Sequence, residues 1–136
     1  MYFIDSSIFL EFHLMQDKWK DCELLFQNIA ESKIIVTCSD FIIYSTILVI
    51  QTKTKEIERI KKFITVIKNL EGLRIIRPSV EIWENAIKIM KEYNLDFDDA
   101  LIISSMISNN IKILISFDKH FDKVKEIKRV EPKNIL

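Results

Sequence analysis

A chain of 136 residues, of which 49% are hydrophobic and 29% charged, has the composition of one folded domain and excludes an extended disordered protein. Its formal net charge is zero, so no global field attracts nucleic acid, and any RNA contact must come from basic residues gathered locally. The N-terminus lacks a basic segment, and the longest apolar run is about half the length that crosses a bilayer. We therefore expect a single domain over residues 1–136, in a soluble cytoplasmic protein with no membrane contact.

Strands and helices are expected to alternate along the chain. The expected strands are short apolar runs, many of them β-branched, at 2–4, 34–37, 73–76, 112–116 and 127–130. The expected helices have apolar residues three and four positions apart. They cover a segment opened by Ser6 or Ser7, then 17–31, 41–50, 54–70 and 80–93, a segment starting near Asp98, and a short turn at 119–123.

Several residues mark where these helices begin and end. Ser39 or Asp40 caps the helix 41–50, and Ser79 opens the helix after the third strand. Gly72 is expected to end the helix before that strand. Because 41–50 is apolar nearly all round, we expect it to be deeply buried or to form a subunit contact.

The alternation of strands and helices predicts an α/β fold. Its sheet should be parallel, with four or five strands and helices on both faces. In such a sheet, active sites form outside the carboxyl ends of the strands.

Three aspartates occupy positions from which they can reach one edge of this sheet. Asp5 ends the first strand, Asp118 follows the fourth, and Asp99 lies in the first turn of a helix. Clustered carboxylates resist joint ionisation unless a cation lies between them, and hard oxygen ligands favour Mg²⁺ or Mn²⁺ over zinc. Such an ion lowers the pKa of a bound water and stabilises charge on a phosphodiester. Ser7 and Ser116 could orient the carboxylates.

An alternative interpretation makes these aspartates helix caps. An aspartate at a strand-to-helix junction often accepts hydrogen bonds from the backbone of the first helical turn. Asp96 and Asp98 suit that role well, and the residues alone leave both interpretations open for Asp5, Asp99 and Asp118.

At these residues the sequence resembles the PIN-domain family, including its VapC-type toxins. The opening YFIDSSIFLE is similar to the start of that family: an apolar strand, an aspartate (Asp5), small hydroxyl residues and a helix. The segment LDFDDALIISSMISNNIKILISFDKHFDKV resembles its second half. There, Asp99 begins an Asp-Ala-Leu-Ile helix, and Ser116 with Asp118 matches a Thr-x-Asp-x-x-Phe strand end.

The resemblance implies a three-layer PIN-like sandwich and a metal-dependent endoribonuclease. It implies that Asp5, Asp99 and Asp118 bind Mg²⁺ or Mn²⁺ and that Ser116 orients the site. It further implies an RNA substrate, single-stranded or structured, a homodimer, and a small antitoxin that inserts into the acidic groove.

The sequence departs from the family pattern at two positions. The family usually has a glutamate where this chain has Ser45, and often a further aspartate where it has His120. Asp40 or Glu11 could compensate for the first departure, and Asp122 lies out of register for the second. The alternative hypothesis is therefore a catalytically weak or inactive PIN fold that binds RNA or a protein.

A third hypothesis, an aspartate-phosphorylating enzyme, requires a second acid two residues after Asp5 or an acidic pair before it. Ser7 and the apolar residues before Asp5 argue against it.

Other polar residues give weaker signals. His13 is expected at the surface or at an interface, and Cys22 and Cys38 as free thiols. A basic patch near the proposed crevice could contact phosphates. Its members are Lys119, Lys123, Lys125, Lys128 and Arg129.

Overall fold

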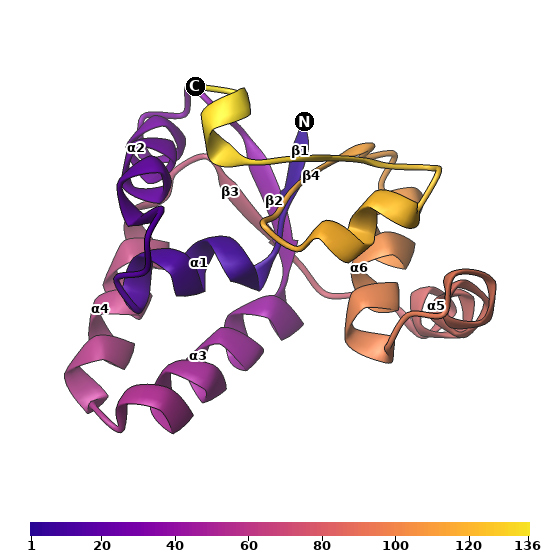
Figure 1. Ribbon diagram of the computed structural model, residues 1–136, viewed down its shortest axis with the longest axis horizontal. Helices are drawn as coiled ribbons and strands as arrows, with labels where there is room; N and C mark the ends of the chain where they lie inside the picture. The colour runs from indigo at the N-terminus through magenta and orange to yellow at the C-terminus, as the bar shows by residue number, and fades with distance from the viewer.

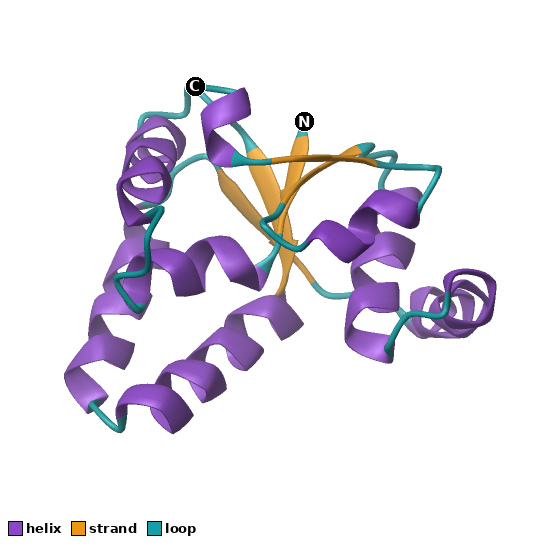
Figure 2. Cartoon of the chain, viewed as in Figure 1, coloured by secondary structure: helices purple, strands orange, loops and turns teal.

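Five parallel strands form the centre of the structure, a computed structural model that describes residues 1–136 (Figure 2). Their spatial order is β3-β2-β1-β4-β5, and every neighbouring pair is parallel. The strands are β1 (Tyr2–Ile4), β2 (Val36–Ser39), β3 (Leu73–Ile76), β4 (Ile113–Ile115) and β5 (Lys128–Val130).

Six α-helices cover the two faces of this sheet. They are α1 (Ser6–His13), α2 (Trp19–Ala30), α3 (Asp40–Thr54), α4 (Ile57–Asn69), α5 (Val80–Tyr93) and α6 (Phe97–Ser108). Two short 3₁₀ helices follow, η1 (Lys119–Lys123) and η2 (Pro132–Asn134). The first four α-helices lie on one side of the sheet, and α5 and α6 lie on the other (Figure 1). The predicted three-layer α/β fold is therefore confirmed.

The strand order creates a crevice at the middle of the sheet. From β1 the chain moves outward through β2 to β3, and it then returns to place β4 on the other side of β1. The connections after β1 and after β4 therefore leave the sheet in different directions. In open α/β sheets, this switch point is where ligands bind.

The two strands at the crevice, β1 and β4, are buried inside the fold. Phe3 and Ile4 of β1, and Leu114 and Ile115 of β4, have no exposed surface. Burial on both faces explains why these strands read as continuous apolar runs without alternation. The crevice thus has a rigid, close-packed floor.

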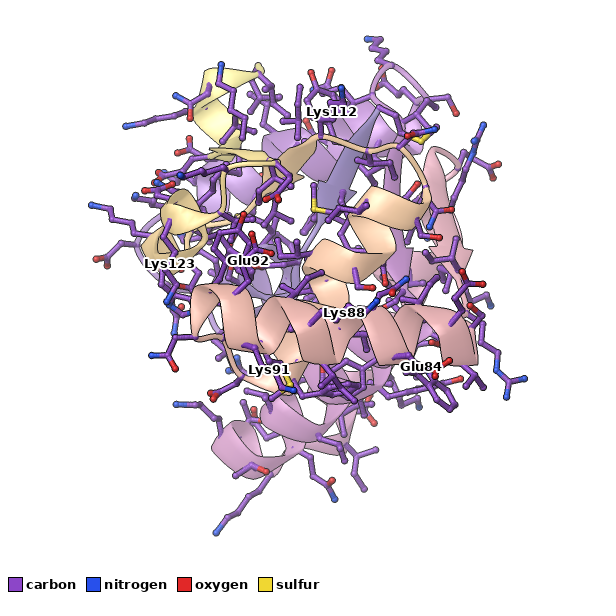
Figure 3. All side chains as sticks on the ribbon, turned by 90° about the vertical axis from the view of Figure 1, so that its right-hand side faces the viewer. Glu84, Lys88, Lys91, Glu92, Lys112 and Lys123 are labelled. Atoms are coloured by element: carbon purple, nitrogen blue, oxygen red, sulfur yellow. The ribbon has the colours of Figure 1, made fainter.

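Helix α5 is the outermost element on its side. Ile82, Ala86 and Ile89 are buried, whereas Glu84 and Lys88 lie along its exposed side (Figure 3). The helix therefore shields α6, which lies between it and the sheet (Figure 1).

The bounds of β2 and α3 differ from the prediction. The second strand begins at Val36, whose partners are Tyr2 and Leu73, and it extends to Ser39. An unbroken apolar run does not mark its own end, so the pairing with β1 and β3 sets the register. Helix α3 continues to Thr54, and Lys55 ends it in the left-handed conformation.

Gly72 has a different role from the one predicted. It does not end α4, because Leu70 is the C-terminal cap and Gly72 has no positive φ. Instead, a Cβ atom at this position would lie 2.5 Å from the carbonyl oxygen of Ile34 and 2.8 Å from that of Ile29. The glycine is needed because two backbone segments approach each other here.

The prediction that His13 lies at the surface or at an interface is wrong, because its side chain is only 5% exposed. Its side chain is buried at the end of α1, where it makes edge-on contacts with the rings of Phe12 and Phe63. Packing of α4 over this end of α1 covers it.

Helix α3 is not buried all round. Ile42, Thr46 and Ile50 are buried, whereas Tyr44 and Leu48 are about 60% exposed. The subunit-contact interpretation of this helix stays a prediction. No helix in the structure has the length and apolar character needed to span a membrane.

Candidate functional site

Asp5 lies where β1 ends and α1 begins, and its carboxylate is almost fully buried. Its Oδ1 accepts hydrogen bonds from the backbone N–H and the hydroxyl of Ser7, both at 2.6 Å. Its Oδ2 accepts one from the hydroxyl of Ser116 at 2.5 Å. Asp5, rather than Ser6 or Ser7, is therefore the N-cap of α1.

Ser116 connects the ends of the two central strands. It is fully buried, and its Oγ both donates to Asp5 and accepts from the backbone N–H of Asp118 at 3.0 Å. The hydroxyl of Ser7 similarly accepts from the N–H of Phe117 at 3.1 Å. We call Asp5, Ser7 and Ser116 the inner cluster, since their hydrogen bonds hold the start of α1 to the end of β4.

Burial raises the pKa of Asp5 to about 6, because the charged form loses its hydration. The hydrogen bonds from Ser116 and Ser7 act in the opposite direction and limit this rise. A carboxylate offers about four lone-pair positions, and three are used here, so one remains for an outside ligand.

Asp99 lies in the first turn of α6 but does not cap it. Asp96 is the N-cap residue, and the Oδ1 of Asp98 accepts from the N–H of Asp99 at 3.0 Å. The carboxylate of Asp99 is half-buried, and burial raises its pKa. Its contacts point away from its own helix, toward the segment after β4.

His120 lies between Asp99 and Asp118. Its Nε2 is 2.7 Å from Oδ2 of Asp99, and its Nδ1 is 2.5 Å from Oδ1 of Asp118. The hydrogen bond to Asp99 is the main reason that the pKa of His120 is raised. Asp118 also caps η1, since its Oδ1 accepts from the N–H of His120 at 3.2 Å. We call Asp99, Asp118 and His120 the rim cluster.

Asp5 and Ser7 of the inner cluster and all of the rim cluster line one cavity of about 360 Å³ at the carboxyl ends of β1 and β4. The structure thus brings together all three predicted aspartates, while Ser116 lies beneath the cavity as the partner of Asp5. The cavity is lined by Asp5, Ser6, Ser7, Phe41, Ile42, Ser45, Val49, Asp98, Asp99, Ile102, Asp118 and His120.

Ser45 lines this cavity, at the position where the family usually has a glutamate. Its hydroxyl donates to the carbonyl of Ile42 at 3.2 Å. Asp40 lines a neighbouring groove instead, and the carboxylate of Glu11 accepts from the N–H of Lys18. Neither residue provides the compensation expected from the sequence.

The rim cluster has a donor set that fits a divalent cation. One ligand atom from each of its three residues lies within 4.8 Å of the other two. Two ligands of one Mg²⁺ or Mn²⁺ ion are at most about 4.2 Å apart, because each bond is about 2.1 Å long. Small side-chain rotations would therefore bring all three atoms to one ion. The ligand atoms of Asp5 lie outside this group.

Arg129 contributes to the site in a way that the sequence did not indicate. Its side chain is only 11% exposed, and it donates to the carbonyl of Ser116 at 2.9 Å and to Oδ1 of Asp122 at 2.8 Å. It therefore fixes the segment that carries Asp118 and His120. Arg129 is therefore not available to the basic patch that was predicted to contact phosphates.

The fold and the site together define the class of this protein. It is an α/β domain with a parallel sheet, and its candidate active site is an acidic cavity at the switch point of that sheet. The PIN domain family model matches residues 2–127. The chain therefore belongs to the PIN domain family.

Solved structures with this fold include toxins and toxin–antitoxin complexes. VapC20 of Mycobacterium tuberculosis, described as a sarcin-ricin loop cleaving toxin, is 17% identical with a TM-score of 0.76, over 94% of this chain and 99% of that one. VapBC2 of Rickettsia felis, bound to a promoter DNA fragment, is 18% identical with a TM-score of 0.66, over 96% and 97%. VapBC-1 of nontypeable Haemophilus influenzae is 16% identical with a TM-score of 0.68, over 97% and 98%. No curated protein matched the sequence.

Proposed function

We propose that this protein is a metal-dependent endoribonuclease, a VapC-like toxin of a toxin–antitoxin pair, that hydrolyses RNA phosphodiesters with Mg²⁺ or Mn²⁺. Membership of the PIN domain family, the likeness to toxin structures and the donor set of the rim cluster support this proposal.

The observation that carries the proposal is the position of Asp99. Asp5 and Asp118 both cap helices, so each has a structural reason to be an aspartate. Asp99 caps nothing, yet its carboxylate is partly buried against the cavity and close to Asp118. Partial burial of a carboxylate beside another acid is unfavourable, so a functional role explains it better than a structural one.

In the proposed site, Asp99 and Asp118 would hold the ion, and Asp5, whose ligand atoms lie outside their group, would complete the site from the buried end of the cavity. A bound divalent cation supplies a nucleophile at neutral pH and stabilises charge on the phosphoryl group. Ser116 keeps the carboxylate of Asp5 in place and fixes the N–H of Asp118. Asp98 and Phe41 are exposed residues of the cavity lining, so RNA would enter beside them.

The test is cleavage of a mixed single-stranded RNA pool with Mn²⁺, with Mg²⁺ or with EDTA. Wild type is compared with Asp99→Asn, which removes a charge and keeps the shape of the side chain. We expect cleavage with either metal, none with EDTA, and a loss of at least about 100-fold in Asp99→Asn.

Asp96→Asn is the matched control. It makes the same chemical change three residues earlier, at an N-cap that forms no side-chain hydrogen bond and lies outside the cavity. It should keep wild-type cleavage. Equal cleavage by wild type and Asp99→Asn, or cleavage that survives EDTA, would contradict the proposal.

Ser45 supports a second candidate, a PIN fold that binds RNA or a protein without cutting. A cavity with Ser45 in place of the family's glutamate has one fewer carboxylate to hold an ion. If folded wild type binds the RNA pool but leaves it intact at millimolar Mn²⁺, and Asp99→Asn binds it equally, this second function replaces the first.

The expected partners belong to the same proposal. We propose an RNA substrate, a small antitoxin protein, a homodimer and a cytoplasmic location. The likeness to toxin–antitoxin complexes supports the antitoxin. Exposed Tyr44 and Leu48 on α3 support the homodimer, and sedimentation of wild type beside a Leu48→Glu variant would test it.

A further inference from the structure

His120 occupies the central position of the rim cluster. Each of its ring nitrogens contacts a different carboxylate, Nε2 that of Asp99 and Nδ1 that of Asp118. Its side chain is 49% exposed, so the ring can turn without disturbing the core. No other residue of the molecule contacts both Asp99 and Asp118 through its side chain.

An imidazole changes the chemistry of a carboxylate site. Oxygen ligands suit Mg²⁺, whereas an imidazole nitrogen favours transition metals such as Mn²⁺ and Co²⁺, whose affinities rise along the first transition row. Mg²⁺ also dehydrates reluctantly and gains little from a nitrogen ligand. A site with two carboxylates and one imidazole should therefore discriminate between these ions.

We propose that His120 is a direct nitrogen ligand of the ion, together with Asp99 and Asp118, and that it makes the site select Mn²⁺ or Co²⁺ over Mg²⁺. This inference rests on the metal site of the proposed function and specifies its donor set. For binding, the exposed ring would turn so that one nitrogen exchanges its contact with a carboxylate oxygen for a bond to the ion.

The same contacts allow an opposite role for His120. The ring lies in the space between the two carboxylates and could act as an internal cation that competes with a metal. The two roles differ in one measurable result: removal of a ligand weakens metal binding, whereas removal of a competitor strengthens it.

The direct test is pulsed electron paramagnetic resonance of the EDTA-treated, Mn²⁺-loaded protein. A coordinated imidazole nitrogen produces ¹⁴N modulation of the Mn²⁺ signal. The chain has two histidines. The other, His13, is buried about 12 Å further along α1 from Asp5, so it does not contribute. We expect the modulation in wild type and its loss in His120→Ala.

Calorimetric titration measures the selectivity. His120→Ala should lower Mn²⁺ and Co²⁺ affinity by at least about tenfold and change Mg²⁺ affinity by less than about threefold. His120→Asp restores an all-oxygen set and should raise Mg²⁺ affinity relative to Co²⁺. Lys119→Ala is the matched control, because Lys119 is the exposed neighbour in η1 and lies outside the cavity.

The outcomes separate this inference from the proposed function. Mn²⁺ that binds wild type and not Asp99→Asn, but shows no ¹⁴N modulation, overturns the nitrogen ligand and leaves the metal site intact. Tighter Mn²⁺ binding by His120→Ala also overturns it, in favour of the competing cation. No Mn²⁺ binding by folded wild type overturns both the inference and the metal-dependent function. Modulation that disappears in His120→Ala supports the inference.

Discussion

The inner cluster and the rim cluster lie at the same cavity but are held in different ways. Asp5, Ser7 and Ser116 are joined by hydrogen bonds at the ends of buried strands, and the Asp5 carboxylate has little access to water. The rim cluster is fixed by contacts of the half-exposed His120. The inner cluster is therefore part of the folded core, whereas the rim can rearrange around a ligand with little effect on stability.

The pH dependence of stability should reveal this difference most strongly at Asp5. The pKa of Asp5 rises from 3.8 in the unfolded chain to about 6 in the fold, so the folded state binds more protons between these values. The contribution of Asp5 to the free energy of unfolding is fully present below pH 3.8 and is lost as the pH rises through about 6. This difference in pKa corresponds to about 3 kcal/mol. Asp5→Asn can still cap α1. Its free energy of unfolding should therefore exceed that of EDTA-treated wild type by up to about 3 kcal/mol at pH 7. Urea unfolding of both proteins from pH 4 to pH 8 tests this, and parallel curves would contradict it.

A second buried titratable group, His13, should change the free energy of unfolding with pH in the opposite direction. Burial lowers the pKa of His13 from 6.5 to about 4, and its Nε2 has no hydrogen-bond partner. Its contribution is fully present above pH 6.5 and is lost as the pH falls toward 4. The free energy of unfolding of His13→Phe should therefore exceed that of wild type by up to about 3 kcal/mol near pH 4 and by much less at pH 7. Thermal melts at pH 4 and at pH 7 measure this difference. An equal effect of the substitution at both pH values would show that the titration of His13 does not affect stability.

Ser116→Ala tests the hydrogen bonds of the inner cluster directly. The change leaves Asp5 Oδ2 and the N–H of Asp118 without their partner, which should destabilise the fold by about 2 kcal/mol at pH 7. Ser105→Ala is the matched control, because Ser105 is equally buried and its hydroxyl has no partner. That control should be neutral or stabilising in the same urea titration. If both variants lose the same free energy of unfolding, the cavity left by the missing hydroxyl, and not the lost hydrogen bonds, accounts for the effect of Ser116→Ala.

The smallest effect is expected at the rim. His120→Ala should change the free energy of unfolding by less than about 0.5 kcal/mol, because exposed ion pairs contribute little and are screened by salt. Urea titrations at low and high salt measure it. A loss as large as that of Ser116→Ala would remove the distinction between the two clusters.

The positions of Asp5, Asp99 and Asp118 at one sheet edge could be predicted, because the ends of parallel strands meet there whatever the details of packing. The same holds for the caps at Ser39 and Ser79, whose hydroxyls accept from the third residue of their helices. These features depend on local chemistry and on the alternation of elements.

Features that depend on contacts between distant segments could not be predicted. His13 is buried because Phe63 of another helix packs against it. The contact of His120 with Asp99 requires the loop after β4 to approach the start of α6. Arg129 points inward because Asp122 and Ser116 lie within its reach. The local sequence around each residue carries little record of these partners.

The pairing of β1 with β4 has a consequence for biosynthesis. Asp5 leaves the ribosome well before its partner Ser116, which is translated 111 residues later. At about 5–20 residues per second, the nascent chain spends several seconds with Asp5 present and β4 absent. During that time neither cluster can form, because both need the segment after β4. The acidic site is therefore completed only after β4 and the segment that follows it have emerged.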